Sequence, residues 1–461
     1  MYQDPQNMRF GGGAAQTFVD FYVLIALLIT VVLTFVLPRK YVIVPLVLMA
    51  VLAPNGQQFY VAGVHLYIGR LLVFFAWSRI LLRGSSEDGL VSGGWNGIDK
   101  IFVAWAIFRA IATSLEFMAM GAVINQAAFL WDTLGGYFLF RYLVRDQEDV
   151  VRLLKTFAMI VVIFAITMTN ERLNYVNVFG YIGGRLAPFV RDGLIRSQGP
   201  FLGPIPAGVF GATLLCLFLW LRQVGKAASW GTAGVIGSLV MVYTSASSTP
   251  LMTVPAGLLA ICFWPARNYM RTVRWLLVAV LLAIHLSMKA PVWMIINHID
   301  LVGGNSSYHR AMLIDGFINH FNEWWLIGVT STAHWGWDMW DQANQFVQEG
   351  ESGGVLTFIC FILVISRSFG RLGTARKMVE GDRLQEWSFW LLGGAMFSQI
   401  VSFFGISFSD QSIYGWYALL AIICTLTTPV LAGSTEETEA EVSEEVSETL
   451  DSSVAYPVAQ T

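Results

Sequence analysis

Four arginines in one connecting segment are the first residues that suggest chemistry. Residues 170–204 contain no lysine but four arginines: Arg172, Arg185, Arg191 and Arg196. Arginine is always charged and forms paired hydrogen bonds with phosphate oxygens, so the segment predicts a site for a phosphate or diphosphate group. The alternative is structural: the arginines pair with Glu171, with Asp192 or with backbone carbonyls.

A second segment places an arginine and a histidine at the start of a predicted helix. A Gly-Gly-Asn turn followed by two serines predicts that a helix begins at Ser306 or Ser307. Arg310 then lies in the first turn, where free amides and the helix dipole attract anions. His309, beside it, is a candidate general base, although a single histidine is more often structural. We expect His320, eleven residues later, on the same helix face.

Further polar residues follow before the next apolar run. Asp338 and Asp341 are three residues apart, but two carboxylates without a third ligand are a weak metal signal, so we predict no metal and no cofactor. The sequence has no Asp-x-Asp pair, HExxH, Walker loop or GxSxG elbow, so nucleotide hydrolysis and metalloprotease chemistry have no support. This part of the chain is rich in tryptophan, which favours either contact with an amphiphile or anchoring at a membrane boundary.

The composition determines what kind of protein must position these residues. The chain has 461 residues, of which 56% are hydrophobic and 13% are charged. Soluble domains carry about 25% charged residues, so a cytosolic enzyme, a disordered protein and a nucleic-acid binder are excluded. We predict an all-α integral membrane protein. The four cysteines fall in apolar runs and are expected to be buried thiols without disulfides.

About twelve or thirteen membrane-spanning helices are expected within residues 18–432, because each spanning helix needs about 20 mostly apolar residues. Residues 1–17 form a polar segment that does not resemble a cleavable signal peptide. The apolar runs are 18–37, 41–54, 59–82, 99–119, 121–144, 151–169, 205–221, 229–246, 249–264, 273–291, 353–369, 387–406 and 413–431.

Basic residues assign the two sides of the membrane. Nineteen of the 28 lysines and arginines lie in alternate short connections, which the positive-inside rule places in the cytoplasm. The long segments 170–204 and 292–352 then lie outside, and the second is expected to be partly helical. The opposite topology would put the four arginines of 170–204 inside. Residues 433–461 are acidic and are predicted to form a disordered tail in the cytoplasm.

Charged residues inside the apolar runs have two possible meanings. Arg70, Arg109, Glu116 and Asp132 must face protein or water rather than lipid. They either line a conduction path, as in a transporter, or pair helix to helix, for example Arg109 with Glu116 or Asp132. We favour the structural interpretation.

The ordered set of loop motifs resembles the O-antigen ligase and O-antigen polymerase family of bacterial membrane glycan transferases. Residues 196–207 (RSQGPFLGPIPA) resemble its Arg-x-x-Gly segment, and residues 306–328 are similar to its arginine-helix segment. Residues 341–358 (DQANQF…GGVLTF) resemble its His-Asn … Glu-x-Gly-x-x-Gly segment. Ala343 stands where the family has a histidine, so the role of that histidine as general base cannot be transferred.

The resemblance implies a GT-C-like fold in the bacterial inner membrane, with the active site facing the periplasm. It implies transfer or polymerisation of a glycan from an undecaprenyl-diphosphate-linked donor to a saccharide acceptor, without a metal, in the synthesis of surface polysaccharide or exopolysaccharide. Arg196 and Arg310, with Arg185 or Arg191, would hold the diphosphate, and Asn344 is a further substrate ligand. His309 or Asp341 would act as the base, and His334 is another substitute for the missing histidine.

Two other function classes remain open. A transporter or flippase of lipid-linked saccharide would place function in the charged spans and leave the outer loops as lids. A non-catalytic component of a polysaccharide export complex would need no chemistry in the loops. Other polysaccharide-assembly proteins are expected as partners in either case, and nucleic acid is not.

Overall fold

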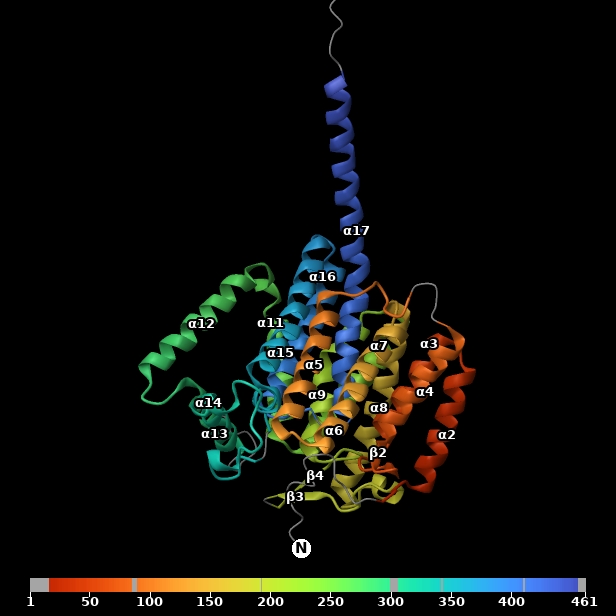
Figure 1. The fold of residues 1–461 in the computed structure, drawn as a ribbon, viewed down its shortest axis with the longest axis vertical. Helices are drawn as coiled ribbons and strands as arrows, with labels where there is room; N and C mark the ends of the chain where they lie inside the picture. Colours follow the sequence, from red (N-terminus) through yellow and green to blue (C-terminus); the bar gives the residue numbers. More distant parts are fainter. Residues whose placement is uncertain are drawn as a thin grey trace, which may run out of the picture.

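The fold is an assembly of helices with two short hairpins (Figure 1). The computed structural model describes residues 16–84, 89–191, 193–298, 306–340, 343–408 and 411–454. The α-helices are α2 Phe21–Val36, α3 Arg39–Leu52, α4 Ile68–Arg83, α5 Gly97–Phe117, α6 Met120–Leu130, α7 Gly136–Leu143, α8 Gln147–Asn174, α9 Pro204–Leu221, α10 Ala228–Ser245, α11 Ser248–Cys262, α12 Met270–Ser287, α13 Ser306–Asn319, α14 Phe321–Trp324, α15 Gln345–Met378, α16 Arg383–Phe403 and α17 Ser412–Val454.

Shorter elements connect these helices. The strands form two antiparallel pairs, β1 Gln58–Val61 with β2 Val64–Tyr67 and β3 Phe189–Arg191 with β4 Leu194–Arg196. A short π-helix, η1 (Trp131–Gly135), joins α6 to α7. The 3₁₀ turns are η2 Val178–Ile182, η3 Gly225–Ala227, η4 Trp264–Tyr269, η5 Val292–His298 and η6 Ala333–Trp335.

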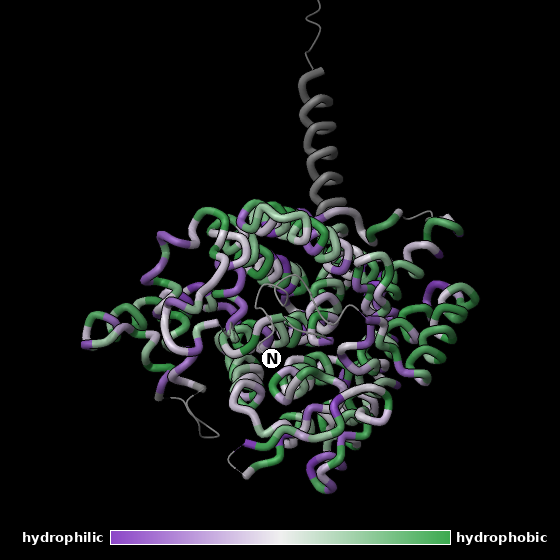
Figure 2. The backbone as a smooth tube through the Cα atoms, turned by 60° about the horizontal axis from the view of Figure 1, so that its bottom comes forward, coloured by the Kyte–Doolittle hydropathy of each residue, from purple (hydrophilic) through white to green (hydrophobic). Residues whose placement is uncertain are grey.

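The helical membrane character predicted from the sequence is confirmed at a coarse level. Each of the thirteen apolar runs contains helix, and the hydrophobic residues follow the helices (Figure 2). In the described part of the chain, six helical segments are long and apolar enough to cross a membrane. They are Gln147–Asn174, Pro204–Leu221, Gly225–Ser245, Trp264–Ser287, Gln345–Met378 and Ser412–Gly433.

One predicted span is wrong in its first part. The run 59–82 begins with the β1–β2 hairpin, and helix α4 starts only at Ile68. The two residues that join the strands, Ala62 and Gly63, both have positive φ angles, of 48° and 85°. Two such residues form the turn that closes a two-residue hairpin, and this turn chemistry overrides the continuous apolar pattern.

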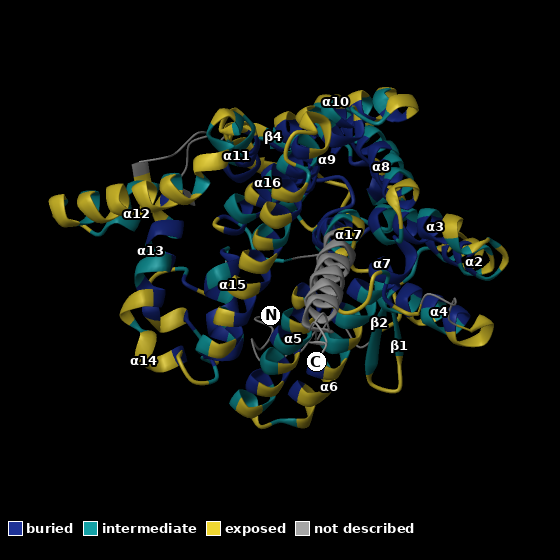
Figure 3. Ribbon diagram, turned by 90° about the horizontal axis from the view of Figure 1, so that it is seen from above, coloured by how far each residue is buried: buried dark blue, intermediate teal, exposed yellow. Residues whose placement is uncertain are grey.

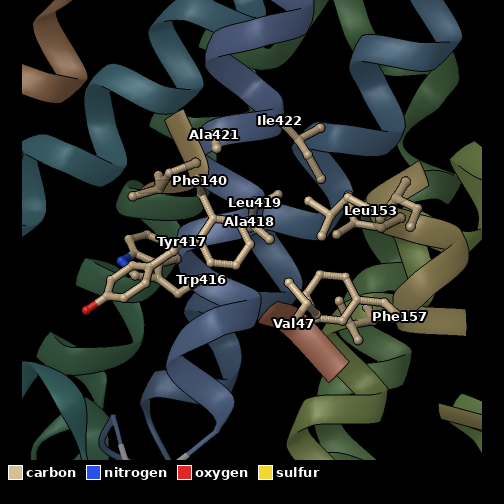
Figure 4. Close-up of a cluster of buried hydrophobic side chains, with 14 of the residues drawn as sticks. Val47, Phe140, Leu153, Phe157, Trp416, Tyr417, Ala418, Leu419, Ala421 and Ile422 are labelled. Carbon is tan, nitrogen blue, oxygen red and sulfur yellow. The ribbon is translucent and has the colours of Figure 1, made fainter. Parts of the chain in front are cut away.

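The main hydrophobic core surrounds α17 (Figure 4). Trp416 and Tyr417 of α17 are almost fully buried, as are Leu153 and Phe157 of α8. Other helices enclose α17 over this stretch, so α17 is the central helix of the bundle. The helix continues to Val454, into the segment that the acidic composition predicts to be disordered. Glutamate and alanine in that segment are good helix formers.

The connections that were predicted to share one side of the membrane contact one another. Among the connections assigned to the cytoplasm, Arg39 donates a hydrogen bond to the Leu143 carbonyl at 3.0 Å. Among those assigned to the outside, the Gln411 side chain donates to the carbonyls of Ala53 and Pro200 at 2.8 and 3.3 Å. The alternation of the chain between two ends therefore agrees with the predicted topology, while the identity of each side stays a prediction.

The charges inside the apolar runs pair between helices, but with other partners than expected. Asp132 pairs with Arg70 at 2.6 Å, and Arg109 pairs with Glu349 at 3.1 Å. The expected pairing of Arg109 with Glu116 or Asp132 is wrong, because its partner comes from α15, far away in the sequence. One of the four cysteines, Cys262 at the end of α11, is also exposed rather than buried.

A second, smaller hydrophobic cluster lies around α13 and α14. Its buried members are Leu313, Phe317, Trp324, Trp335, Met339 and Val347. The rings of Phe317 and Trp324 stack with centroids 4.0 Å apart. Helix α12, which leads into this region, lies apart from the bundle and has no buried residue (Figure 3). We call residues 306–340 the α13 module; Val347, the remaining buried member of the cluster, belongs to α15.

Helix α15 is broken at Gly354, where the α13 module meets the bundle. Gly354 has a φ of 71° and a ψ of −172°, and a Cβ atom there would lie 2.4 Å from the Leu326 carbonyl oxygen. The break exposes backbone groups that are bonded from the crossing segment: Val329 N donates to Glu351 O at 2.9 Å, and Val355 N donates to Trp325 O at 2.8 Å.

We expect Gly354→Ala to lower the stability of the protein by at least about 2 kcal/mol, because the conformation is nearly restricted to glycine and the new methyl group meets a backbone oxygen. The thermal midpoint in detergent measures this effect. Gly370→Ala is the matched control on the same helix, since a Cβ there meets no atom within 4 Å. An equal midpoint for both variants would contradict the strained geometry at Gly354.

Candidate functional site

Arg196 and Arg310 meet at the beginning of α11. Arg196 Nη2 donates to Ser247 Oγ at 2.7 Å, and Arg310 Nη2 donates to Thr249 Oγ1 at 2.6 Å. Ser247 is the N-cap residue of α11, and Thr249 lies in its first turn. Two arginines that are far apart in the sequence thus reach one helix N-terminus. We call Arg196, Arg310, Ser247 and Thr249 the α11 anion site.

The β3–β4 hairpin positions Arg196 at this site. Arg196 is the last residue of β4, and the next residue, Ser197, donates its backbone N–H to the Thr244 carbonyl at 3.0 Å. This bond ties the end of the hairpin to the end of α10. Because Ser247 follows α10 by only two residues, Arg196 reaches it at short range.

The α13 module positions Arg310 at the α11 anion site. Helix α13 begins at Ser306, as the turn sequence predicted, and Arg310 is only 7% exposed. Its partner Thr249 also donates its hydroxyl proton to the Gly405 carbonyl at 3.3 Å. Arg310 is therefore held against α11 and, through Thr249, against the connection between α16 and α17.

The local electrostatics of the α11 anion site favour a negative group. The N-terminus of α11 carries the positive end of the helix dipole, and the side chain of its N-cap residue makes no capping hydrogen bond. Ser247 instead donates to the Ser245 carbonyl at 2.8 Å and accepts from Arg196. Two guanidinium groups beside a helix N-terminus can form bidentate hydrogen bonds with phosphate oxygens.

The other arginines of residues 170–204 divide into two groups. Arg172 donates to the Tyr243 carbonyl at 3.1 Å and lies over the Tyr243 ring, so it caps the end of α10. Arg185 and Arg191 are exposed. The Arg185 guanidinium lies 4.6 Å from the centroid of the Phe189 ring.

The hairpin places Arg185, Arg191 and Arg196 around Phe189. Phe189 is the cross-strand partner of Arg196, and Arg191 follows it by two residues on the same strand. Paired residues and residues two apart share one face of a hairpin. The structure thus brings the three arginines predicted to bind diphosphate to one face, with Arg196 nearest to α11.

The candidate catalytic residues are placed unequally. His309 is half-buried and directly precedes Arg310 in the first turn of α13. Asp341 lies outside the described residues. His320 lies just after the end of α13 at Asn319; its backbone N–H still donates to the Gly316 carbonyl at 3.0 Å, and its ring contacts the same carbonyl at 2.8 Å, while the shared face with His309 stays a prediction.

His334 lies at the opposite end of the α13 module from Arg310. Its ring stands 5.9 Å from that of His320, which is about 15 Å along the helix axis from Arg310. His334 Nε2 is 2.7 Å from Glu323 Oε2, which also accepts from Trp335 Nε1 at 3.0 Å. The Trp335 and His334 contacts lower the pKa of Glu323. This position makes His334 a poor base for chemistry at the α11 anion site.

Asn344 has a clear structural function. Its side chain accepts hydrogen bonds from the amides of Phe346 and Val347, so it caps α15. The next residue, Gln345, bonds both Glu349 and the amide of Phe408. The connection between α16 and α17 therefore contacts the start of α15 through Phe408 and the α11 anion site through Gly405.

Ser247 and Thr249 are site residues that the sequence analysis missed. A signal was present: residues 244–250 read TSASSTP, and serine, threonine and an early proline mark helix starts. The segment lies in a very short connection between two apolar runs and therefore does not stand out as a loop. Within the described residues, no group of three or more His, Cys, Asp or Glu side chains could hold a metal ion.

Comparison with known proteins adds no family assignment. No protein-family model matches the chain, and no match was found among curated proteins. The functional interpretation therefore depends on the residues and geometry of the α11 anion site.

Proposed function

We propose that the chain is a bacterial inner-membrane glycosyltransferase of the O-antigen ligase or polymerase type, which transfers glycan from an undecaprenyl-diphosphate-linked donor to a saccharide acceptor. One observation carries the proposal: Arg196 and Arg310, predicted separately from two loop motifs, contact hydroxyls at one helix N-terminus. The diphosphate of the donor binds there, and its lipid lies between helices in the bilayer. The α11 anion site faces the periplasm.

The reaction follows from the chemistry of a lipid-diphosphate donor. An acceptor hydroxyl attacks the anomeric carbon and forms a new carbon–oxygen bond, while the bond from that carbon to the diphosphate oxygen breaks. His309 takes the hydroxyl proton, and the lipid diphosphate leaves with both bonding electrons. Arg196 and Arg310 stabilise the charge that develops on the leaving group, with Arg185 and Arg191 available along the hairpin face. The activated donor supplies the free energy.

The described contacts favour an enzyme over a transporter. Arg70 and Arg109, which would be expected along a conduction path, are engaged in ion pairs with Asp132 and Glu349 that join helices. The arginines predicted to bind phosphate instead include Arg191 and Arg196 on the hairpin and Arg310 at the start of α13. Function is therefore assigned to the outer end of the bundle.

Purified protein in lipid vesicles, given a polyprenyl-diphosphate-linked oligosaccharide and a saccharide acceptor, tests the proposal. We expect mass spectrometry to detect free polyprenyl diphosphate together with a lengthened or transferred glycan. Intact donor that moves between leaflets would instead identify a transporter. Donor that is neither altered nor moved would favour a non-catalytic component of an export complex.

A further inference from the structure

Glu171 is a buried carboxylate next to the loop that carries Arg196. It lies in the last turn of α8 and is 0% exposed. Its oxygens accept hydrogen bonds from the backbone N–H of Gln198 at 3.1 and 3.2 Å and from that of Gly199 at 3.0 Å. Both amides belong to the residues immediately after Arg196 and Ser197, so the carboxylate fixes the backbone that leaves the hairpin.

Other contacts fix the same three residues. The Ser197 hydroxyl donates to the Met168 carbonyl at 2.8 Å, and the Asn177 side chain donates to the Gly199 carbonyl at 2.7 Å. Ser197, Gln198 and Gly199 are therefore attached to α8 on one side and, through the Thr244 carbonyl, to α10 on the other. Among these contacts, that of Glu171 is the one in which a single carboxyl group accepts from two neighbouring backbone amides.

We propose that Glu171 is a positioning residue for Arg196, an inference that rests on the proposed function of the α11 anion site. Glu171 hydrogen-bonds the backbone two and three residues after Arg196, and it acts on the bound diphosphate only through that arginine. Its carboxylate holds the 197–199 backbone so that the Arg196 guanidinium points at Ser247 rather than into solvent. Loss of the carboxylate leaves two buried amides without their acceptor, and the loop must move to satisfy them.

A double-mutant cycle separates positioning from a general structural effect. Binding of a polyprenyl diphosphate to the purified protein and donor turnover are measured for Glu171→Ala, Arg196→Ala and the double variant. We expect Glu171→Ala to weaken diphosphate binding about tenfold in the wild-type background and hardly at all in the Arg196→Ala background. Glu171→Gln, which retains one acceptor oxygen, should restore part of the binding. Glu148→Ala, at an exposed position on the same helix, is the control.

The outcomes distinguish this inference from the proposed function. Equal losses of binding in both backgrounds would overturn the positioning role, since a merely structural residue acts irrespective of Arg196. If the wild type binds polyprenyl diphosphate but does not turn over the donor, the proposed function fails while the binding cycle still decides the role of Glu171. If the wild type binds no polyprenyl diphosphate, both are overturned.

Discussion

Replacement of Arg310 by alanine is expected to reduce glycan transfer by about 100-fold or more, the effect typical of removing one preorganised donor from a developing charge. Arg310 contributes a buried guanidinium to the α11 anion site, and its contact with Thr249 fixes its direction. Arg196→Ala should have a similar effect. Turnover of the lipid-linked donor at saturating acceptor is the measurement.

The controls address folding and charge. Arg274→Ala removes an exposed arginine from α12, where its Nε only bonds the Met270 carbonyl, and should retain full activity. Arg310→Lys keeps the charge but loses the bidentate geometry, so its rate of donor turnover should lie between those of wild type and Arg310→Ala. Near-normal turnover in both alanine variants would remove the diphosphate assignment, provided that the thermal midpoints match wild type.

The second large effect is expected on stability, at the opposite end of the bundle. Asp99 and Arg141 are both fully buried and form a salt bridge at 3.1 Å, and Tyr137 Oη also donates to Asp99 at 2.6 Å. Asp99→Ala leaves the guanidinium buried without its carboxylate, and such breaks cost about 3–5 kcal/mol. We expect a lower thermal midpoint and little folded protein in detergent extracts.

The pairing can be tested by removing both charges. The double variant Asp99→Ala with Arg141→Leu should recover much of the lost stability, because no buried charge then remains unpaired. Asp99→Asn keeps the size of the side chain and one acceptor oxygen, so its thermal midpoint should lie between those of wild type and Asp99→Ala. A double variant less stable than Asp99→Ala would show that the pair is not the source of the loss.

Local chemistry explains which parts of the fold and site were predictable. Apolar runs identify helices because each run must bury itself in protein or lipid, and the turn before Ser306 marks a helix start within a few residues. Arg196 was a candidate because arginine without lysine in a predicted outer loop indicates anion recognition, and Arg310 because it lies in the first turn of a predicted helix. These inferences need only the residues themselves and their immediate neighbours.

Contacts between distant segments were not predictable. Arg109 pairs with Glu349, and Arg196 bonds Ser247, because helix packing brings these distant segments together. A local sequence pattern carries no information about that packing. Arg172 and Arg196 are both arginines of the same segment, but Arg172 caps α10 because it lies against the carbonyl and the ring of Tyr243. The sequence therefore indicated which residues were candidates but could not distinguish their individual roles.

The division of the protein into two hydrophobic clusters has a consequence for ligand binding. Arg196 lies on the β3–β4 hairpin beside the main bundle, whereas Arg310 belongs to the α13 module, whose small core around Phe317 and Trp324 also includes Val347 of α15. Under the proposed function, a diphosphate held by both arginines would be a removable link between the bundle and the α13 module, in addition to the backbone hydrogen bonds that join them beside Gly354. Part of the free energy of diphosphate binding would then stabilise the association of the α13 module with the bundle. Release of the diphosphate would remove that added link and leave the contacts beside Gly354 as the connection between the two parts.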